Sequence, residues 1–253
     1  MAAMPPHGTV GRMPKAHHVY RSWLADEGQA LAAALDGDPA TLVPSCPGWS
    51  LTDLVAHVGS YHRWAADLLQ DASPQPRAPY ALRPDPRAPL AEWYRTSLEL
   101  LLKAVDTTGP DTPMWTVTTD QTAGAWCRRQ AHDLTIHRWD AQHARGHAQP
   151  IHPERATDFI EELFTVALPY ILPFLDRPVP TRTLALRSAD GTFHRRIDAA
   201  TGRLRLSHEQ APADATLTGT PSDLLLTLWR RDTATTLTGD LGALAAWQQA
   251  IDG

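Results

Sequence analysis

The spacing of hydrophobic residues changes once along the chain, and this change constrains the fold more than any other feature of the sequence. In the first 150 residues, apolar side chains recur every three or four positions, which is typical of amphipathic helices. The helical segments that this spacing predicts are 16–35, 50–68, 90–105 and 123–145. After residue 180 the spacing becomes an alternation, which is typical of strands. The sequence therefore predicts an α+β protein whose helical part precedes the part with strands.

The helical part is expected to be a four-helix bundle with one long connection. Six prolines between Asp71 and Leu90 exclude regular structure there and separate the second helix from the third. Ser50 and Asp53 have the spacing of a capping box, which marks where the second helix begins. Four helices of this length with a single long link are typical of a four-helix bundle.

The second part is expected to be a small α+β domain with a sheet of antiparallel type. A fifth helix over 153–167 leads into it. The strands predicted by alternation and by turn residues are 183–186, 193–197, 204–206, 215–219 and 235–238, and the helices are 221–229 and 241–251. The expected organisation is thus a loose tail over 1–15, a bundle over 16–150 and the second domain over 151–253.

Charge and composition exclude several classes of protein. The net charge is −5 and no block of basic residues stands out, which argues against a nucleic-acid partner. The apolar runs are too short to span a membrane, and Met1 to Lys15 lacks the apolar core of a signal peptide. Cys46 and Cys127 could form one disulfide at most, so a reducing cytoplasm is the expected location.

The fourth predicted helix carries a carboxylate and an imidazole within its apolar face. Asp133 and His137 lie four positions apart, so about 40° separates them around the helix axis, and Leu134 and Ile136 flank them. Polar groups on a buried face must be paired or bound to a metal. An exposed carboxylate–imidazole pair, common on helix surfaces, is the alternative.

A metal site on this face needs a third ligand from another helix. Zinc accepts imidazole nitrogen and carboxylate oxygen, and a catalytic zinc usually keeps three protein ligands and one open position. His57, on the border of the second helix's apolar stripe, is the best-placed histidine. His132 is a poorer candidate, because it points about 140° away from His137. Zinc is favoured for such a set, but nickel, cobalt, iron or copper would also be tolerated.

Two motifs resemble those of a known enzyme family. The first, VPSCPGWS, runs from Val43 to Ser50 and continues through Asp53–Gly59. The second comprises Arg128–Asp133 and His137–Asp140. In this order they resemble the mycothiol-dependent maleylpyruvate isomerase family, and the resemblance covers nearly the whole chain. It implies a DinB-like metal-binding four-helix bundle followed by a small α+β domain similar to sterol-carrier folds.

The resemblance also implies a ligand set and a reaction. Carried over by position, the metal ligands are His57, Asp133 and His137. The family's acidic ligand is expected to be Glu, so the shorter Asp133 is expected to shift the metal's position and affinity. The implied cofactors are a divalent metal, zinc by preference, and mycothiol as the thiol co-substrate. The metal would deprotonate the thiol, and the thiolate would attack a small electrophile.

Several functions remain open at this stage. The shared motifs do not separate an isomerase from a thiol S-transferase. A metal-dependent hydrolase on the same scaffold is the second interpretation, and a non-catalytic metal- or ligand-binding protein is the third. Cys46 and Cys127 could act as nucleophiles, but the sequence shows no group that would activate either thiol.

Two arginines follow the predicted helix over 221–229. Arg230 and Arg231 are candidates for binding a substrate carboxylate across the domain boundary, because a guanidinium can hold a carboxylate through two hydrogen bonds. The alternative is a solvated helix end that complements the helix dipole. The expected partners are therefore a small electrophile and a low-molecular-weight thiol. Motifs for phosphate or dinucleotide binding and for serine hydrolases are missing.

Overall fold

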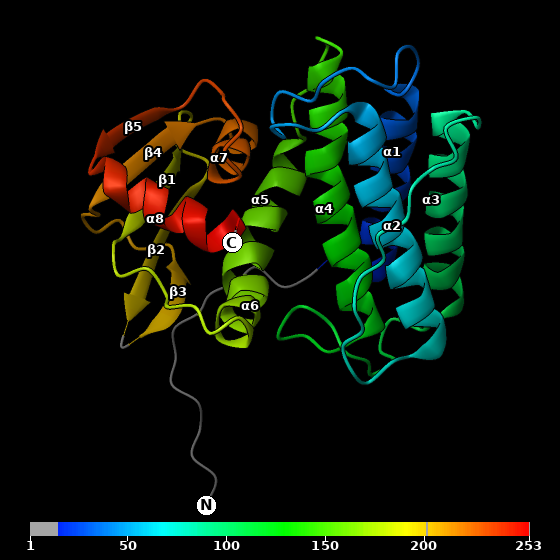
Figure 1. Cartoon of the computed structure of the whole chain (residues 1–253). Coiled ribbons are helices and arrows are strands. Elements are labelled where there is room, and N and C mark those ends of the chain that lie inside the picture. Colours follow the sequence, from blue (N-terminus) through cyan, green and yellow to red (C-terminus); the bar gives the residue numbers. More distant parts are fainter. Residues whose placement is uncertain (1–14, 201, 253) are drawn as a thin grey trace, which may run out of the picture. The chain divides into compact units, whose positions relative to one another are not determined.

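The computed structural model describes residues 15–200 and 202–252 of the chain (Figure 1). They form two compact units: one contains residues 15–116 and 120–150, and the other contains 117–119 and 151–252. The tail expected over 1–15 lies outside the described residues except for Lys15. The α+β class expected from the sequence is confirmed, with a helical bundle in the first unit and a five-stranded sheet in the second.

The first unit is a bundle of four helices, as the hydrophobic spacing predicts. Their bounds are α1 His17–Ala33, α2 Leu51–Asp71, α3 Leu90–Thr107 and α4 Ala123–Ala144. The capping box is present at the start of α2, where the Ser50 side chain accepts from the Asp53 backbone N–H and the Asp53 carboxylate accepts from Ser50. The proline-rich stretch 72–89 contains neither helix nor strand. It is nevertheless attached to α2, because the Leu82 N–H donates to Ser60 Oγ at 2.9 Å.

A buried ion pair joins the first helix to the last. Arg138 Nε donates to Glu27 Oε2 at 2.6 Å, and both residues are only 4% exposed. The same guanidinium also donates through Nη1 to Gln142 Oε1 at 2.9 Å and to the Gln149 carbonyl at 2.7 Å. A buried charge is tolerated only when it is paired and its remaining hydrogen-bond groups are satisfied. This cluster therefore fixes how α4 lies against α1.

The second unit begins with a helix longer than the one expected over 153–167. Helix α5 Pro153–Glu162 continues into the π-helical turn η1 Leu163–Ala167 and then into α6 Leu168–Phe174. The following elements are β1 Leu184–Ser188, β2 His194–Ala200, β3 Arg203–Ser207, β4 Ala215–Gly219, α7 Pro221–Leu228, β5 Thr236–Gly239 and α8 Leu241–Asp252.

The sheet is mixed, which corrects the expectation of an antiparallel type. Its strand order is β3-β2-β1-β4-β5, and β1 pairs with β4 in parallel, while the other neighbouring pairs are antiparallel. Parallel neighbours need a long crossover connection. Here the hairpin of β2 and β3, followed by residues 208–214, supplies that crossover, so no helix is required between the two strands.

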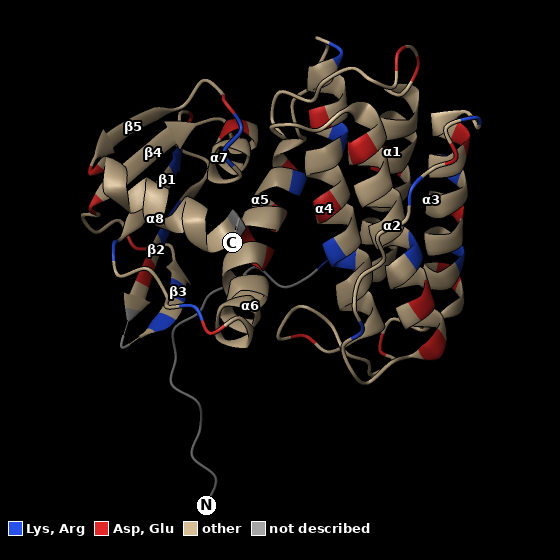
Figure 2. Cartoon of the chain, in the orientation of Figure 1, with Lys and Arg blue, Asp and Glu red and all other residues tan. Residues whose placement is uncertain are grey.

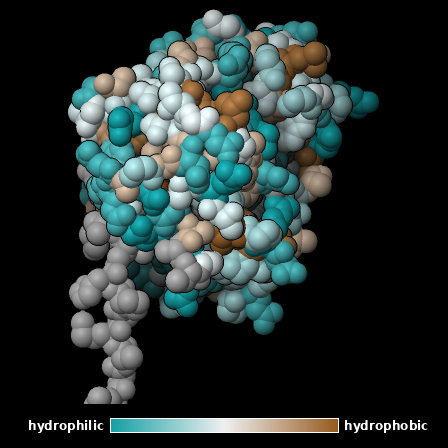
Figure 3. Space-filling view, turned by 90° about the vertical axis from the view of Figure 1, so that its left-hand side faces the viewer, coloured by the Kyte–Doolittle hydropathy of each residue, from teal (hydrophilic) through white to brown (hydrophobic). Residues whose placement is uncertain are grey.

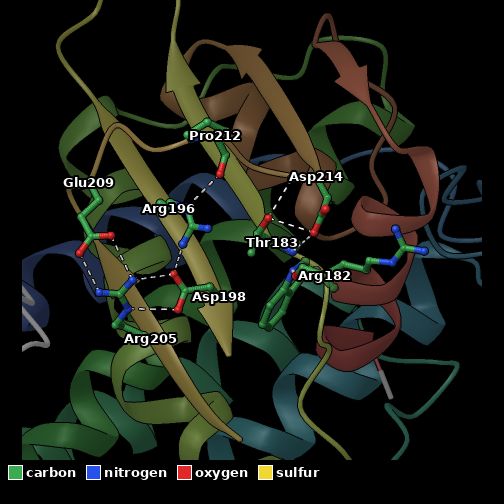
Figure 4. A network of polar contacts seen from close by, with 9 residues as sticks. Arg182, Thr183, Arg196, Asp198, Arg205, Glu209, Pro212 and Asp214 are labelled. Carbon is green, nitrogen blue, oxygen red and sulfur yellow. Dashed lines mark hydrogen bonds and ion pairs between the residues drawn. The ribbon is translucent and has the colours of Figure 1, made fainter. Parts of the chain in front are cut away.

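An ionic network holds residues 208–214 to strands β2 and β3 (Figure 4). Asp198 on β2 is only 6% exposed and forms ion pairs with Arg196 and with Arg205. Arg205 also pairs with Glu209, in the segment 208–214 that follows β3, at 2.8 Å. Arg196 Nε donates to the Pro212 carbonyl at 3.4 Å. These contacts connect two strands and the segment that leaves them.

Charged and hydrophobic residues are both dispersed over the parts of the chain that Figures 2 and 3 show. Acidic and basic side chains are interspersed along the bundle helices (Figure 2). Hydrophilic residues cover most of the face in Figure 3, and hydrophobic ones form small separate patches. Among the described helices, none is both long and apolar enough to cross a membrane.

Polar side chains are buried in the core of the bundle. His62 on α2 and Gln130 on α4 are fully buried, and His62 Nδ1 lies 2.9 Å from Gln130 Oε1. Tyr94 on α3 is also fully buried, with its ring centroid 5.9 Å from that of His62. Burial lowers the pKa of His62 to about 4, against the opposing effect of the Gln130 hydrogen bond. This histidine is therefore neutral in the folded protein near pH 7.

The buried His62 is expected to make the bundle sensitive to moderate acid. Its pKa falls from 6.5 to about 4 on folding, so the unfolded chain takes up the proton first. Stability should be unaffected by this group above pH 6.5 and should decrease as the pH falls from 6.5 towards 4. The total loss is about 3 kcal/mol.

Urea unfolding at pH 7 and pH 5 measures this loss. Replacement of His62→Gln should lower stability at pH 7 and reduce the difference between the two pH values. The matched control is His147→Gln, at an exposed histidine after α4, which should keep the wild-type difference. An equal pH dependence in the His62→Gln variant and the wild type would contradict the assignment.

Candidate metal centre

The three sequence-predicted ligands come from two helices of the bundle. His57 lies on α2, and Asp133 and His137 lie on α4. The rings of His57 and His137 meet edge to face, with their centroids 5.1 Å apart. His137 Nε2 lies 3.9 Å from Asp133 Oδ2. The structure therefore brings these side chains into one region of the bundle.

The carboxylate–imidazole pair on α4 is largely enclosed. The exposed fraction of the side chain is 21% for Asp133 and 12% for His137. The 3.9 Å separation is too long for a hydrogen bond between them. Asp133 Oδ2 is buried and has no hydrogen-bond partner among the residues described. A buried carboxylate oxygen of this kind is costly unless a cation or a donor binds it.

A second carboxylate supports His137 from behind. Asp140, one turn further along α4, is fully buried, and its Oδ2 lies 3.2 Å from His137 Nδ1. Because a carboxylate oxygen accepts, Nδ1–H donates in this contact and Nε2 keeps its lone pair. Ser45 Oγ donates to Asp140 Oδ1 at 2.6 Å. This is the arrangement in which a carboxylate fixes the tautomer of a metal-binding histidine.

The surroundings of His57 disfavour its charged form. The residue is exposed, yet enough protein surrounds its ring that desolvation lowers its pKa. A charge on His137 would lower the pKa of His57 further, and the charge of Asp133 acts in the opposite direction. A metal ligand must be the neutral imidazole, so this lowered pKa favours ligation.

The donor set suits a divalent metal, although the side chains as placed do not enclose one. No group of three or more His, Cys, Asp or Glu within residues 15–200 and 202–252 has a metal-holding arrangement. Two ligand atoms on a tetrahedral zinc lie ~3.3 Å apart. The 3.9 Å between His137 Nε2 and Asp133 Oδ2 exceeds this by a few tenths of an ångström. Small side-chain rotations would close this gap, so the two donors on α4 fit a divalent metal.

Neither cysteine is a strong candidate for a nucleophile. Cys127 is fully buried, and burial raises the pKa of its thiol to about 12. Cys46 is half-buried, and its Sγ lies 3.7 Å from Asp140 Oδ2. Neither forms a disulfide among the described residues. The carboxylate beside Cys46 disfavours its thiolate.

The two candidate arginines lie in the second unit, directly after α7. Arg230 has a positive φ of 59°, and Arg231 Nη1 donates to the Trp229 carbonyl at 2.6 Å. Their role in binding a substrate carboxylate stays a prediction. A hollow of about 610 Å³ in this unit is lined by other residues, between Leu172, Pro178 and Ala246.

Three residues near the histidines were not singled out from the sequence. Asp140 belongs to the second motif, and its spacing of three from His137 on a helix could have identified it. Ser45 and Trp49 belong to the first motif but lie in a loop. Their contacts with α4 and α2 arise only when the helices pack, so no local pattern reveals them.

Two solved structures share the fold of most of the chain. One is the crystal structure of the mycothiol-dependent maleylpyruvate isomerase, with 16% sequence identity and a TM-score of 0.64. The other is a histidine-to-alanine mutant of the mycothiol-dependent maleylpyruvate isomerase, with 15% identity and a TM-score of 0.62. Each likeness covers 90% of this chain and 96% of the solved one. No curated protein matches the chain.

The bundle also matches a family by its sequence. Residues 22–142 match the model of the mycothiol maleylpyruvate isomerase N-terminal domain. The matched range contains all of α2, α3 and nearly all of α4, and with them the three predicted ligands and Asp140. By this match, the bundle belongs to the family of mycothiol maleylpyruvate isomerase N-terminal domains.

Proposed function

We propose that the protein is a metal-dependent enzyme in which a low-molecular-weight thiol, mycothiol by preference, attacks a small electrophile. One observation carries the proposal: His57, Asp133 and His137 are grouped in a bundle of this family, with Asp140 fixing His137 from behind. The solved relatives are isomerases of maleylpyruvate that depend on mycothiol. This site would serve two reactions. One is the isomerisation of a compound related to maleylpyruvate, and the other is the transfer of the thiol to an electrophile.

The chain's own groups are arranged for ligation. His137 presents Nε2 because its Nδ1–H is bound by Asp140. Desolvation lowers the pKa of His57, which favours the neutral imidazole that a metal requires. Asp133 directs a buried oxygen towards His137 Nε2 at 3.9 Å. We infer that these three side chains hold a divalent cation. Zinc is the metal that best suits two imidazoles and one carboxylate.

Such a cation would lower the pKa of a thiol that binds it, which is the chemistry the reaction needs at neutral pH. The enclosed position of Asp133 and His137 limits the access of water. Asp133 is one methylene shorter than the Glu expected in the family, so it requires the donors of α4 and α2 to lie closer together. The free cysteines are compatible with a reducing compartment such as the cytoplasm.

Removal of a ligand should abolish tight metal binding. The wild type, reconstituted with zinc, is expected to hold one metal per chain by elemental analysis. His57→Ala and Asp133→Ala should weaken zinc binding by more than the roughly 10- to 100-fold typical of outer-shell changes. His147→Ala, at an exposed histidine, is the matched control and should bind zinc like the wild type.

Calorimetric titration with mycothiol then separates the functions. Heat of binding to the zinc-loaded wild type, absent from the metal-free protein, supports a thiol-using enzyme. Zinc without thiol binding would instead favour a hydrolase that activates water. If His57→Ala and His137→Ala both retained wild-type zinc affinity, the proposed site would be wrong.

Loss of the supporting carboxylate should weaken the site without removing a ligand. In Asp140→Asn the amide can donate to His137 Nδ1, which favours the tautomer that carries hydrogen on Nε2. Zinc affinity, measured by competition with a chromophoric chelator, should fall about 10- to 100-fold. Ser45→Ala removes the hydrogen bond from Ser45 Oγ to Asp140 and is the control, with an expected change of less than threefold. Equal effects of the two variants would argue against a role in fixing the tautomer.

The arginines after α7 are expected to act on substrate affinity alone. Arg230→Asn suits the positive φ at this position, because asparagine tolerates the left-handed region. If either arginine binds a carboxylate of maleylpyruvate, its loss should raise KM roughly 10- to 100-fold, since hydrogen bonds to charged groups contribute about 1.5–3 kcal/mol. Zinc content should not change. Arg187→Ala, on the exposed side of β1, is the control for Arg230→Asn and Arg231→Ala.

A further inference from the structure

The two histidines of the proposed centre are supported in different ways. His137 Nδ1 is bound by a buried carboxylate at 3.2 Å. The His57 ring, by contrast, makes no hydrogen bond to any residue in the part of the chain that the structure describes. A metal-binding histidine usually donates its second nitrogen to a neighbour that fixes the ring. The orientation of His57 must therefore depend on packing.

Two aromatic rings pack against His57. The centroid of the Trp49 indole lies 5.2 Å from that of His57, with the two planes tilted by 54°. His137 contacts the same imidazole edge to face at 5.1 Å. Because His137 belongs to the proposed ligand set, Trp49 is an aromatic neighbour that can limit His57 from outside this set. Trp49 is half-buried, so part of its ring remains accessible.

The backbone that carries Trp49 is tightly held. The Val43 N–H donates to the Trp49 carbonyl at 2.8 Å, and the Trp49 N–H donates to the Cys46 carbonyl at 3.0 Å. Gly48, just before the indole, has a φ of +83°, which favours glycine. Ser50, just after it, caps α2. The indole thus stands on a rigid turn at the start of the helix that carries His57.

We propose that Trp49 is a positioning residue for His57, restricting its imidazole to the rotamer that faces His137 and Asp133. This inference rests on the proposed metal centre, and it deepens that proposal by assigning a role to the loop motif. A histidine side chain has three χ1 wells and about two χ2 wells, so a fully unrestricted ring would occupy the binding rotamer roughly one-sixth of the time. The expected contribution of Trp49 is therefore a modest factor in metal affinity.

Metal affinity of the Trp49 variants tests the inference. In Trp49→Ala, the zinc dissociation constant, measured by chelator competition, should rise by up to about sixfold, as the rotamer count implies. Trp49→Phe keeps a ring beside His57 and should remain within about twofold of the wild type. The matched control is Trp93→Ala, at a half-buried tryptophan of the same unit that packs on the Arg63 guanidinium at 5.1 Å. It should leave zinc affinity unchanged.

A second readout uses the metal-free protein. The χ1 couplings of His57, measured by NMR, should indicate one rotamer in the wild type and an average of several in Trp49→Ala. Unchanged zinc affinity with unchanged couplings in Trp49→Ala, or a Phe variant no better than the Ala variant, would overturn the inference.

A failure of the proposed function would give different results. The wild type would then bind no zinc, or His57→Ala would bind zinc normally. The NMR couplings would still decide whether Trp49 positions the imidazole.

Discussion

The arrangement of the candidate centre depends on the hydrogen bonds that the buried carboxylate of Asp140 accepts. It is fully enclosed, and such a group is stable only when its oxygens accept hydrogen bonds. One oxygen accepts from Ser45 in the loop before α2, and the other from His137 on its own helix. The hydrogen bonds to this one side chain therefore join the loop to α4 and fix the imidazole of His137, which faces Asp133.

The pairing of α2 with α4 extends this arrangement along the bundle. His57 meets His137, whereas His62, further along α2, meets Gln130, which is earlier on α4. The two helices thus run in opposite directions, and polar pairs occur at successive levels between them. The outer level holds the candidate ligands, which are partly accessible. The inner level is fully buried and neutral, because burial lowers the pKa of His62 to about 4. A charge is therefore disfavoured in the inner level, and a cation would be expected only at the outer one.

Local patterns in the sequence were sufficient for most of the helical bundle. Helix starts are set by short-range chemistry, and the capping box of Ser50 and Asp53 forms as its spacing predicts. The helix predicted over 153–167 ends where α6 begins, and α6 contains Pro169 and Pro173. Proline is tolerated in the first turn of a helix, where its missing N–H is not needed, and Pro169 lies in the first turn of α6. The parallel pairing of β1 with β4 and the contacts of Ser45 and Trp49 depend on residues distant in the sequence. No window of neighbouring residues contains that information.

The ion pair between Glu27 and Arg138 joins residues 111 positions apart, and this separation has a consequence for synthesis. While the ribosome has produced only α1 to α3, the carboxylate of Glu27 lacks its guanidinium, and its burial would be costly. The first three helices are then expected to stay loosely associated until α4 emerges. Because α4 also carries Asp133 and His137, the candidate ligands of a nascent chain come together only at about the moment when its bundle can close. A chain that ends before α4 therefore carries only one of the three candidate ligands, His57.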